Sequence, residues 1–304
     1  MNLINGPMPN TDMAVQRYEA IQQRLPRADF PAQSIWRAHL GELVDDIDCF
    51  VLDGFGVLNI GEQAVPGAVD RVNGLRAAGK LIRVLTNGAS RPSTSTVDKY
   101  RGWGLEFDIP EVISSRDALA RALQREPTMR WGFAALADSD LPSLSPNHVL
   151  LEDDDRAYRD CDGFVLLGTG NWNAERQSML AAALADSPRP VWVGNPDLVA
   201  PHPGGLSREP GLYAHALNDA CLATPQFYGK PFDNAFQLVR ETLDGVDPSR
   251  VAMVGDTLHT DILGGAQAGW KTVLVTGHGL LKGLDAEAAI NRSGIRPDYI
   301  IPTT

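Results

Sequence analysis

The stretch that decides the fold is residues 252–277, AMVGDTLHTDILGGAQAGWKTVLVTG. It opens with a short apolar run, typical of a buried strand, that leads through a glycine to Asp256. A helical segment follows over 260–269, and a second apolar run, 271–277, predicts another strand. Two buried strands joined through a helix are the repeating unit of a parallel sheet that is covered on both faces.

The same alternation occurs in the first half of the chain. Apolar runs predict strands over 49–53 and 81–88, and amphipathic patterns predict helices over 68–79 and 94–104. A further helix, predicted over 231–243, precedes the deciding stretch. The predicted fold class is therefore α/β, a Rossmann-like doubly wound parallel sheet.

The middle of the chain differs in texture, because Pro and Gly are dense there and the segment contains helices and strands of its own. It is too long for a loop, so we predict an inserted α/β cap domain. Before the core, apolar positions at helical spacing predict helices over 12–25 and 34–47. The predicted organisation is an N-terminal helical extension (1–42), a core domain formed by 43–114 and 226–304, and a cap domain (115–225).

Composition limits the function classes. Of the 304 residues, 43% are hydrophobic and 21% are charged, as in soluble globular proteins, and the net charge of −11 argues against nucleic-acid and membrane partners. Cys49, Cys161 and Cys221 are too few and too scattered for a disulfide framework or a zinc site. We see no signal peptide, so we expect a cytoplasmic protein; the sequence leaves a monomer and a homodimer open.

Polar residues mark the ends of the predicted strands. Asp53, Thr86 and Asp256 each follow or close an apolar run, and ligands of such sheets bind at the carboxyl ends of strands. Taken singly, each has an ordinary explanation as a turn, strand-end or helix-capping residue. Asp256 and Asp261, five residues apart across a strand–loop–helix junction, suit a magnesium ligand with a supporting acid. Lys230 is out of place at a helix start, since that position prefers anions.

In this chain order, the four strand-end sites resemble the motifs of the haloacid dehalogenase (HAD) superfamily. The motifs are VLDGFG (51–56), LTNGASRP (85–92), YGKP (228–231) and GDTLHTD (255–261). Together with PGAVDRVNGLRAAGK (66–80) and GNPD (194–197), they are similar to subfamily IIA, the NagD-like and 4-nitrophenylphosphatase-like phosphatases whose cap lies between the second and third motifs. The resemblance covers nearly the whole chain after the N-terminal extension.

The resemblance implies a Mg²⁺-dependent phosphatase that acts on a small phosphorylated metabolite. Asp53 would be the nucleophile and form an aspartyl-phosphate that water hydrolyses. The implied catalytic residues are Asp53, Thr86 and Lys230. The implied phosphate-binding residues are Gly54, Thr86, Asn87 and Lys230. The implied Mg²⁺ ligands are Asp53, the backbone oxygen of Phe55, and Asp256, with Asp261 orienting Lys230 or a metal-bound water.

The GNPD segment of the predicted cap supplies two candidate substrate contacts, Asn195 and Asp197. Similar segments in the subfamily face the active site, although an Asx turn before a proline explains these residues equally well. His259, inside the fourth motif, is a further candidate for carrying protons at the mouth of the site, and a solvent-facing loop histidine is the ordinary alternative.

Phe55 departs from the family pattern, which places a second aspartate two residues after the nucleophile. That aspartate protonates the leaving oxygen and later activates water, and proton transfer of this kind is worth about 10²–10⁴ in rate. Three hypotheses follow: a phosphatase selective for good leaving groups, another HAD hydrolase that uses Asp53 without phosphate, or a catalytically weak protein that binds a phosphorylated ligand. Some relatives carry a bulky aromatic at this place, and the remaining site residues favour the first hypothesis over the second.

Overall fold

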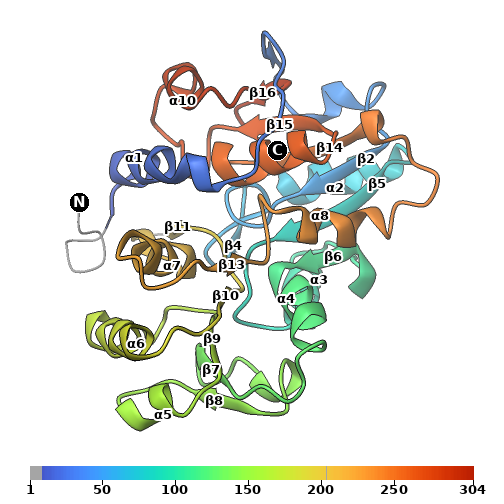
Figure 1. The fold of residues 1–304 in the computed structure, drawn as a ribbon. Helices are drawn as coiled ribbons and strands as arrows, with labels where there is room; N and C mark the ends of the chain where they lie inside the picture. The colour runs from blue at the N-terminus through green and yellow to red at the C-terminus, as the bar shows by residue number, and fades with distance from the viewer. Residues whose placement is uncertain (1–8, 203) are drawn as a thin grey trace.

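Two separate parallel sheets organise the computed structural model, which describes residues 9–202 and 204–304 (Figure 1). The larger sheet has seven strands in the order β1-β16-β15-β14-β2-β5-β6, and all neighbouring pairs are parallel. Its strands are β1 (Ile35–Trp36), β2 (Cys49–Leu52), β5 (Leu81–Thr86), β6 (Val112–Ser114), β14 (Val251–Gly255), β15 (Lys271–Val275) and β16 (Tyr299–Ile301).

Helices cover both faces of the larger sheet. Side chains alternate across a strand, so in β2 Phe50 and Leu52 pack with α2 and α3, whereas Cys49 and Val51 pack with α4 and α8. This burial on both faces explains the uninterrupted apolar run and confirms the predicted doubly wound α/β class. The helices around this sheet are α2 (Ala68–Ala77), α3 (Ser93–Gly102), α4 (Ser115–Leu123), α8 (Asp233–Arg240), α9 (Leu263–Gln267) and α10 (Ala286–Ser293).

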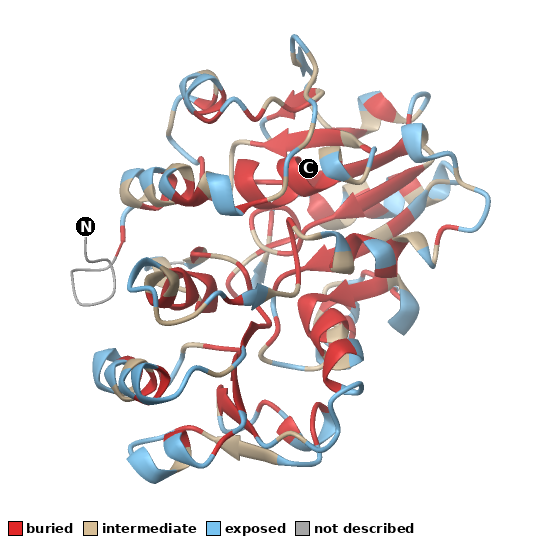
Figure 2. Cartoon of the chain, in the orientation of Figure 1, coloured by how far each residue is buried: buried red, intermediate tan, exposed pale blue. Residues whose placement is uncertain are grey.

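The smaller sheet has five parallel strands in the order β13-β10-β9-β7-β8. Figure 2 shows buried strands in both sheets and exposed outer faces on the helices around them. The strands are β7 (Trp131–Ala134), β8 (His148–Leu150), β9 (Gly163–Leu166), β10 (Val191–Val193) and β13 (Gln226–Phe227). The accompanying helices are α5 (Asp155–Arg159), α6 (Ala174–Asp186) and α7 (Pro210–Asp219). We refer to residues 115–225 as the cap segment; its boundaries as a domain remain a prediction.

Two antiparallel hairpins follow sequence motifs. The first pairs β3 (Asn59–Ile60) with β4 (Gln63–Ala64), directly after the Asp53 loop. The second pairs β11 (Val199–His202) with β12 (Gly205–Arg208), directly after the GNPD segment. The rings of Phe55 and His202 lie 6.2 Å apart, so the second hairpin reaches the Asp53 loop.

The N-terminal extension differs from its prediction in one element. The predicted helix over 12–25 is present as α1 (Thr11–Ile21), followed by a 3₁₀ turn (Gln22–Arg24), and the side chain of Asn10 caps it by accepting a hydrogen bond from the Met13 amide at 2.9 Å. Among the described residues, no helix combines the length and apolar character that a bilayer crossing requires.

The predicted helix over 34–47 is wrong. Ile35–Trp36 forms the edge strand β1, because its backbone pairs with β16 through the Ile35 amide and the Asp298 carbonyl at 2.8 Å. The apolar spacing that suggested a helix comes from a buried 3₁₀ turn (Leu40–Leu43) under α2. The helix predicted over 260–269 is present but opens with a π-helical turn (Leu258–Ile262) before α9.

Candidate active site

The candidate site lies at the carboxyl edge of three neighbouring strands. Asp53 directly follows β2, Asp256 directly follows β14, and Thr86 is the last residue of β5. The order β14-β2-β5 therefore brings the three side chains to one edge of the sheet. All three side chains are buried.

Lys230 joins this group from the loop between β13 and α8. Its Nζ lies 2.5 Å from Oδ1 of Asp53 and 2.7 Å from Oδ1 of Asp261. The lysine is 1% exposed, so the two ion pairs are shielded from water and their geometry is fixed by the surrounding structure. The sequence-predicted residues Asp53, Lys230 and Asp261 are thus brought into direct contact.

Hydrogen bonds from Thr257 and from the Leu280 amide, in the loop after β15, hold the two aspartates of the fourth motif. Asp256 accepts hydrogen bonds from the Leu280 amide at 2.6 Å and from the Thr257 hydroxyl at 2.9 Å. Asp261 accepts one from the Thr257 amide at 3.1 Å. These bonds leave little freedom for either carboxylate, as a preorganised site requires.

Asp53, Asp256 and Asp261 each offer an oxygen within 4.8 Å of the others, a separation that a single metal ion can bridge. Three carboxylates against one lysine leave uncompensated negative charge, and an all-oxygen donor set suits a hard divalent cation such as Mg²⁺. The backbone makes room for this cluster: a Cβ at Gly279 would lie 1.6 Å from Oδ2 of Asp256. The residues present therefore fit a Mg²⁺ ion.

Electrostatics agree with this reading. Burial raises the pKa of Asp53 to about 8, opposed by Lys230 and reinforced by Asp261 and Asp256. Burial and Asp261 raise the pKa of Asp256 to about 7. For Lys230, burial lowers the pKa, but the carboxylates of Asp261, Asp53 and Asp197 outweigh it and hold the pKa above its ordinary value. The carboxylates need more positive charge than Lys230 supplies, and a divalent cation would provide it.

Gly54 allows polar groups to approach the turn after Asp53. A Cβ at this position would lie 3.0 Å from the Tyr100 hydroxyl oxygen and 3.4 Å from Oγ1 of Thr86. The Gly54 amide donates to Oδ1 of Asp53 at 2.7 Å, and the Gly88 amide donates to Thr86 Oγ1 at 3.1 Å. Roles of Gly54 and Thr86 in binding phosphate stay predictions.

Asn87 connects the lysine loop to the cap segment. Its Oδ1 accepts from the Lys230 amide at 2.8 Å, and its Nδ2 donates to the Lys230 carbonyl at 3.0 Å and to Oδ1 of Asp197 at 2.8 Å. Asp197 thus lies beside the site, and burial raises the pKa of its carboxyl to about 8. Both polar atoms of the Asn87 side chain take part in these hydrogen bonds. Its role in binding phosphate stays a prediction.

Asn195 supports the turn that carries Asp197. Its Oδ1 accepts from the Asp197 amide at 3.0 Å, which is the Asx turn expected as the ordinary explanation. Its Nδ2 donates to Glu209 at 3.1 Å, and burial raises the pKa of that glutamate to about 7. Asp197 therefore lies beside the site and is hydrogen-bonded to Asn87. Asn195 contacts the Asp197 backbone and supports its turn.

Phe55 is half-buried, two residues after Asp53. Its ring lies 6.2 Å from the His202 ring of the β11–β12 hairpin, and the Lys99 ammonium lies 5.5 Å from its ring centre. Lys99 also lies 5.6 Å and 5.5 Å from the ring centres of Tyr100 and Trp103. The family pattern has an acid at this position. In this chain the position holds a phenyl ring that lies beside the Lys99 ammonium and the His202 imidazole.

His259 does not lie at the mouth of the site. It is buried under α1, its ring stacks on Tyr18 at 5.2 Å, and burial lowers its pKa to about 4. Both the proton-carrying role at the mouth and the solvent-facing alternative are therefore wrong. Tyr18, His202 and Glu209 were not predicted as neighbours of the site, because they lie in segments where no motif or spacing marked them.

Comparison with known proteins supports a single family. A haloacid dehalogenase-like hydrolase family matches residues 50–139, and a HAD-hydrolase-like family matches residues 227–304. Glycerol-3-phosphate phosphatase from Gallus gallus is 30% identical over 281 residues, covering 84% of this chain and 89% of that protein. Phosphoglycolate phosphatase 2 from Arabidopsis thaliana is 26% identical, covering 89% of this chain and 95% of that protein.

Solved structures agree with the fold. The crystal structure of a possible sugar phosphatase of the HAD superfamily from Cytophaga hutchinsonii superposes with a TM-score of 0.76 at 25% sequence identity. The superposition covers 89% of this chain and 98% of the other. The p-nitrophenyl phosphatase from Archaeoglobus fulgidus superposes with a TM-score of 0.67 at 26% identity, covering 85% of this chain and 97% of the other.

Proposed function

Because this chain belongs to the haloacid dehalogenase superfamily and is a hydrolase of phosphate monoesters, we propose that it is a Mg²⁺-dependent phosphatase that works through an aspartyl-phosphate at Asp53. The observation that carries the proposal is the buried contact of Lys230 with Asp53 and Asp261, next to Asp256 at the same edge of the sheet.

The chemistry proceeds in two displacements at phosphorus. An oxygen of Asp53 attacks phosphorus, the bond to the leaving oxygen breaks, and the leaving group departs with the bonding electrons. Water then attacks the same phosphorus, inorganic phosphate leaves, and the Asp53 carboxylate is restored. Lys230 and the Thr86 hydroxyl stabilise charge on the transferring group, and Asp261 holds the lysine in place.

A bound Mg²⁺ ion supplies the charge neutralisation that lets a carboxylate approach a phosphoryl dianion. Asp53 and Asp256 would hold the ion, together with the backbone oxygen of Phe55, which any side chain at that position supplies. The cluster of carboxylates that Asp53 and Asp256 form with Asp261 is consistent with that role.

Phe55 limits which esters are cleaved well. A phenyl ring cannot donate a proton to the leaving oxygen, so alkoxide leaving groups must depart unassisted or take a proton from water. It also cannot activate the water that hydrolyses the aspartyl-phosphate. We therefore propose that aryl and acyl phosphates react faster than alkyl phosphates, and that breakdown of the intermediate is slow.

The proposed natural substrate is a small phosphorylated metabolite such as a sugar, polyol or hydroxy-acid phosphate. Two observations support this proposal. Relatives of the chain are named as phosphatases of glycerol 3-phosphate and of phosphoglycolate. In addition, Asp197 of the cap segment lies beside the site. Such a protein would be cytosolic, and no nucleic-acid or membrane partner is proposed.

The test is Mg²⁺-dependent turnover of acetyl phosphate, 4-nitrophenyl phosphate and glycerol 3-phosphate by the wild type, Asp53→Asn and Phe55→Asp. The expected result is metal-dependent turnover that Asp53→Asn abolishes. Hydrolysis that needs no metal, or that survives in Asp53→Asn, contradicts the proposal. The second candidate function is a protein that binds a phosphorylated ligand, and the absence of an acid at position 55 favours it. This candidate is supported if the wild type hydrolyses none of the three substrates while Phe55→Asp hydrolyses them.

A further inference from the structure

The α1 helix contacts both the cap segment and the loop of the fourth motif. One apolar cluster contains the buried face of α1, residues near the GNPD segment, and residues of the π-helical turn after Asp256. From α1 these are Ala14, Val15, Tyr18 and Ile21; from the cap segment, Leu198, Val199 and Leu212; from the fourth-motif loop and α9, Leu258, Ile262 and Leu263. A single apolar surface on α1 therefore packs against two parts of the chain that each carry candidate site residues.

Tyr18 touches both loops with one side chain. Its hydroxyl oxygen accepts a hydrogen bond from the Leu198 amide at 3.0 Å, directly after Asp197. Its ring stacks on His259 at 5.2 Å with an interplanar angle of 14°, and His259 lies between Asp256 and Asp261 in the chain. The tyrosine is 3% exposed, so neither contact is shared with solvent.

Ion pairs extend the contacts along the outer side of α1. Arg17 and Arg24 reach Asp219, at the end of α7 in the cap segment, at 2.5 Å and 2.7 Å. Glu19 pairs with Arg292 of α10 at 3.0 Å. Figure 1 shows α1 between α10, which belongs to the larger sheet, and α7, which belongs to the cap segment.

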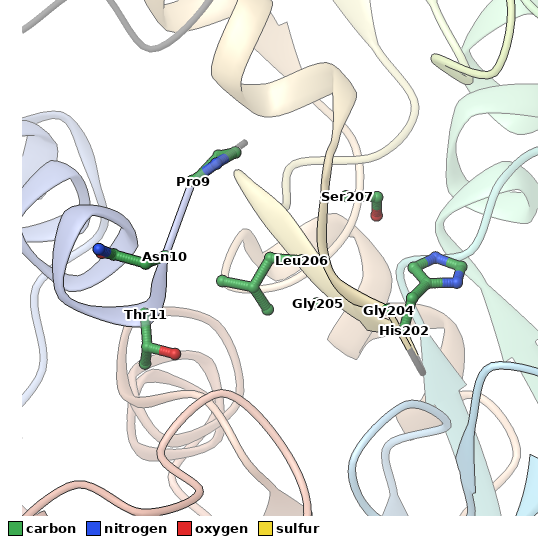
Figure 3. A pocket seen from close by; sticks show the side chains of 8 residues that line it. All are labelled: Pro9, Asn10, Thr11, His202, Gly204, Gly205, Leu206 and Ser207. Atoms are coloured by element: carbon green, nitrogen blue, oxygen red, sulfur yellow. The ribbon is translucent and has the colours of Figure 1, made fainter. Parts of the chain in front are cut away.

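Val199 and Leu206 of the β11–β12 hairpin pack in the same apolar cluster as α1, but a cavity separates the start of α1 from the rest of the hairpin. This cavity of about 610 Å³ has Asn10 and Thr11 on one side and Leu206 and Ser207 on the other (Figure 3). Further along, α1 and the 3₁₀ turn after it contact the cap segment through the Tyr18 hydrogen bond, the apolar cluster, the Asp219 ion pairs and the hydrogen bond from Arg24 to the His215 carbonyl.

We propose that α1 is a strap that holds the cap segment against the fourth-motif loop, and that Tyr18 is the positioning residue that sets Asp197 over the candidate site. The Tyr18 bond fixes the backbone directly after Asp197, while Asn87 fixes the Asp197 side chain. Asn195 and the Gly211 amide also bind the Asp197 backbone. Loss of the Tyr18 bond therefore removes the anchor that reaches this turn from α1. The effect on substrate rests on the proposed function of the site, whereas the effect on cap position does not.

The kinetic test compares Tyr18→Phe and Tyr18→Leu with the wild type. Tyr18→Phe keeps the ring on His259 and removes only the acceptor, so KM for glycerol 3-phosphate should rise about three- to tenfold with kcat little changed. Acetyl phosphate, which is too small to depend on the cap segment, should show no change. Tyr18→Leu, which also removes the ring from His259, should raise the KM for glycerol 3-phosphate further. Equal effects on both substrates in Tyr18→Phe, or no effect on either, overturn the positioning role.

A distance measurement tests the strap without relying on activity. Cys221 is exposed just after α7, while Cys49 and Cys161 are buried, so Cys221 and an introduced Asp244→Cys on the exposed surface after α8 accept a pair of spin labels. The distance distribution should broaden in Asp219→Asn and in Tyr18→Phe. Asp155→Asn removes the same charge from an exposed ion pair with Arg159 within α5 and should leave it unchanged.

The two failures are distinguishable. A wild type inert on every phosphate ester contradicts the proposed function, and the distance measurement still decides whether α1 is a strap. Unchanged distributions in both Asp219→Asn and Tyr18→Phe overturn the strap, even in a fully active enzyme.

Discussion

In the proposed mechanism, Phe55 determines how protons are handled at a site that keeps the other residues of phosphoryl transfer. Asp53, Lys230, Asp256 and Asp261 converge in a buried cluster, so the residues that would bind metal and phosphate do not depend on the side chain at position 55. The Phe55 ring instead lies beside the His202 ring and the Lys99 ammonium. In the proposed mechanism, Phe55 therefore removes proton transfer and leaves charge stabilisation in place.

Phe55→Asp should raise kcat/KM for glycerol 3-phosphate by at least about tenfold, because it returns an acid to the leaving oxygen, and such groups contribute about 10²–10⁴ in rate. The gain for acetyl phosphate should be smaller, since its leaving group needs no proton. Steady-state kinetics on the two substrates measures the difference, with Phe55→Asn as the matched control that adds polarity without an acid. An equal gain in Phe55→Asn would contradict the proton-transfer explanation.

Gly56 offers a second residue-scale test. It has a φ of +81°, and a Cβ there would lie 2.5 Å from Oδ2 of Asp256. Gly56→Ala should therefore displace Asp256 and abolish Mg²⁺ binding, measured by calorimetric titration with Mg²⁺. Gly79 is the matched control, because its φ is +77° but nothing lies within 4 Å of its Cβ position.

Both glycine variants should lose about 1–2 kcal/mol of stability from the left-handed backbone. Only Gly56→Ala should lose the metal. Retained Mg²⁺ affinity in Gly56→Ala would show that Asp256 is not a ligand.

At the scale of elements, α7 contains a buried histidine beside Arg17 of α1 and Arg24 of the 3₁₀ turn that follows it. His215 is 2% exposed and stacks on Phe227 of β13, and its carbonyl accepts a hydrogen bond from Arg24. Burial lowers the pKa of His215 to about 3, and the charges of Arg17 and Arg24 add to this effect. The folded state therefore holds the imidazole neutral.

This histidine should make the protein sensitive to acid. Above pH 6.5 it is neutral whether the chain is folded or unfolded, so its contribution to stability does not change. Between pH 6.5 and about 3 the unfolded chain binds a proton that the folded one does not, and stability falls by about 1.4 kcal/mol per pH unit. Chemical unfolding measured from pH 7 to pH 5 gives the free energy of unfolding as a function of pH. Below pH 6.5 the slope of that plot should be smaller by this amount in His215→Gln than in the wild type. Identical slopes would mean that His215 is protonated in the folded protein.

Most elements could be predicted from the sequence, and the exceptions have physical causes. The strands β2, β5, β14 and β15 are buried on both faces, so their apolar runs carry a strong local signal. The strand β1 carries none, because a two-residue edge strand exists only through its pairing with β16, which is more than 260 residues away along the chain. Local periodicity favoured a helix there, and tertiary pairing overrode it.

The candidate site was predictable in its residues but not in its surroundings. Asp53, Thr86, Lys230 and Asp256 lie at strand ends or in adjoining loops, where the topology of a parallel sheet brings them together. Tyr18 approaches from a helix some 180 residues away from Leu198 in the chain, and no spacing in the sequence encodes that contact. His259 was misplaced for the same reason, since the element that buries it is α1.

At the scale of the whole molecule, the buried carboxylates of the proposed metal site should link Mg²⁺ binding to stability. Asp53 and Asp256 have raised pKa values, so their ionised forms cost folding free energy at neutral pH. Mg²⁺ at a hundred times its dissociation constant should stabilise the folded protein by about 2.7 kcal/mol. Thermal unfolding with Mg²⁺ and with a chelator measures this, and Asp256→Asn should remove the difference. A melting temperature that is indifferent to Mg²⁺ in the wild type would contradict a metal site among these residues.

The most direct test of the proposed mechanism is the first turnover of 4-nitrophenyl phosphate, followed in a stopped-flow instrument with Mg²⁺ present. A good leaving group makes formation of the aspartyl-phosphate fast, and Phe55 leaves its hydrolysis slow. We therefore predict a burst of about one equivalent of 4-nitrophenolate per chain before slow steady turnover. The burst should vanish in Asp53→Asn, and the steady rate should rise in Phe55→Asp. Linear release from the first turnover in the wild type, or a burst that persists in Asp53→Asn, would contradict the mechanism.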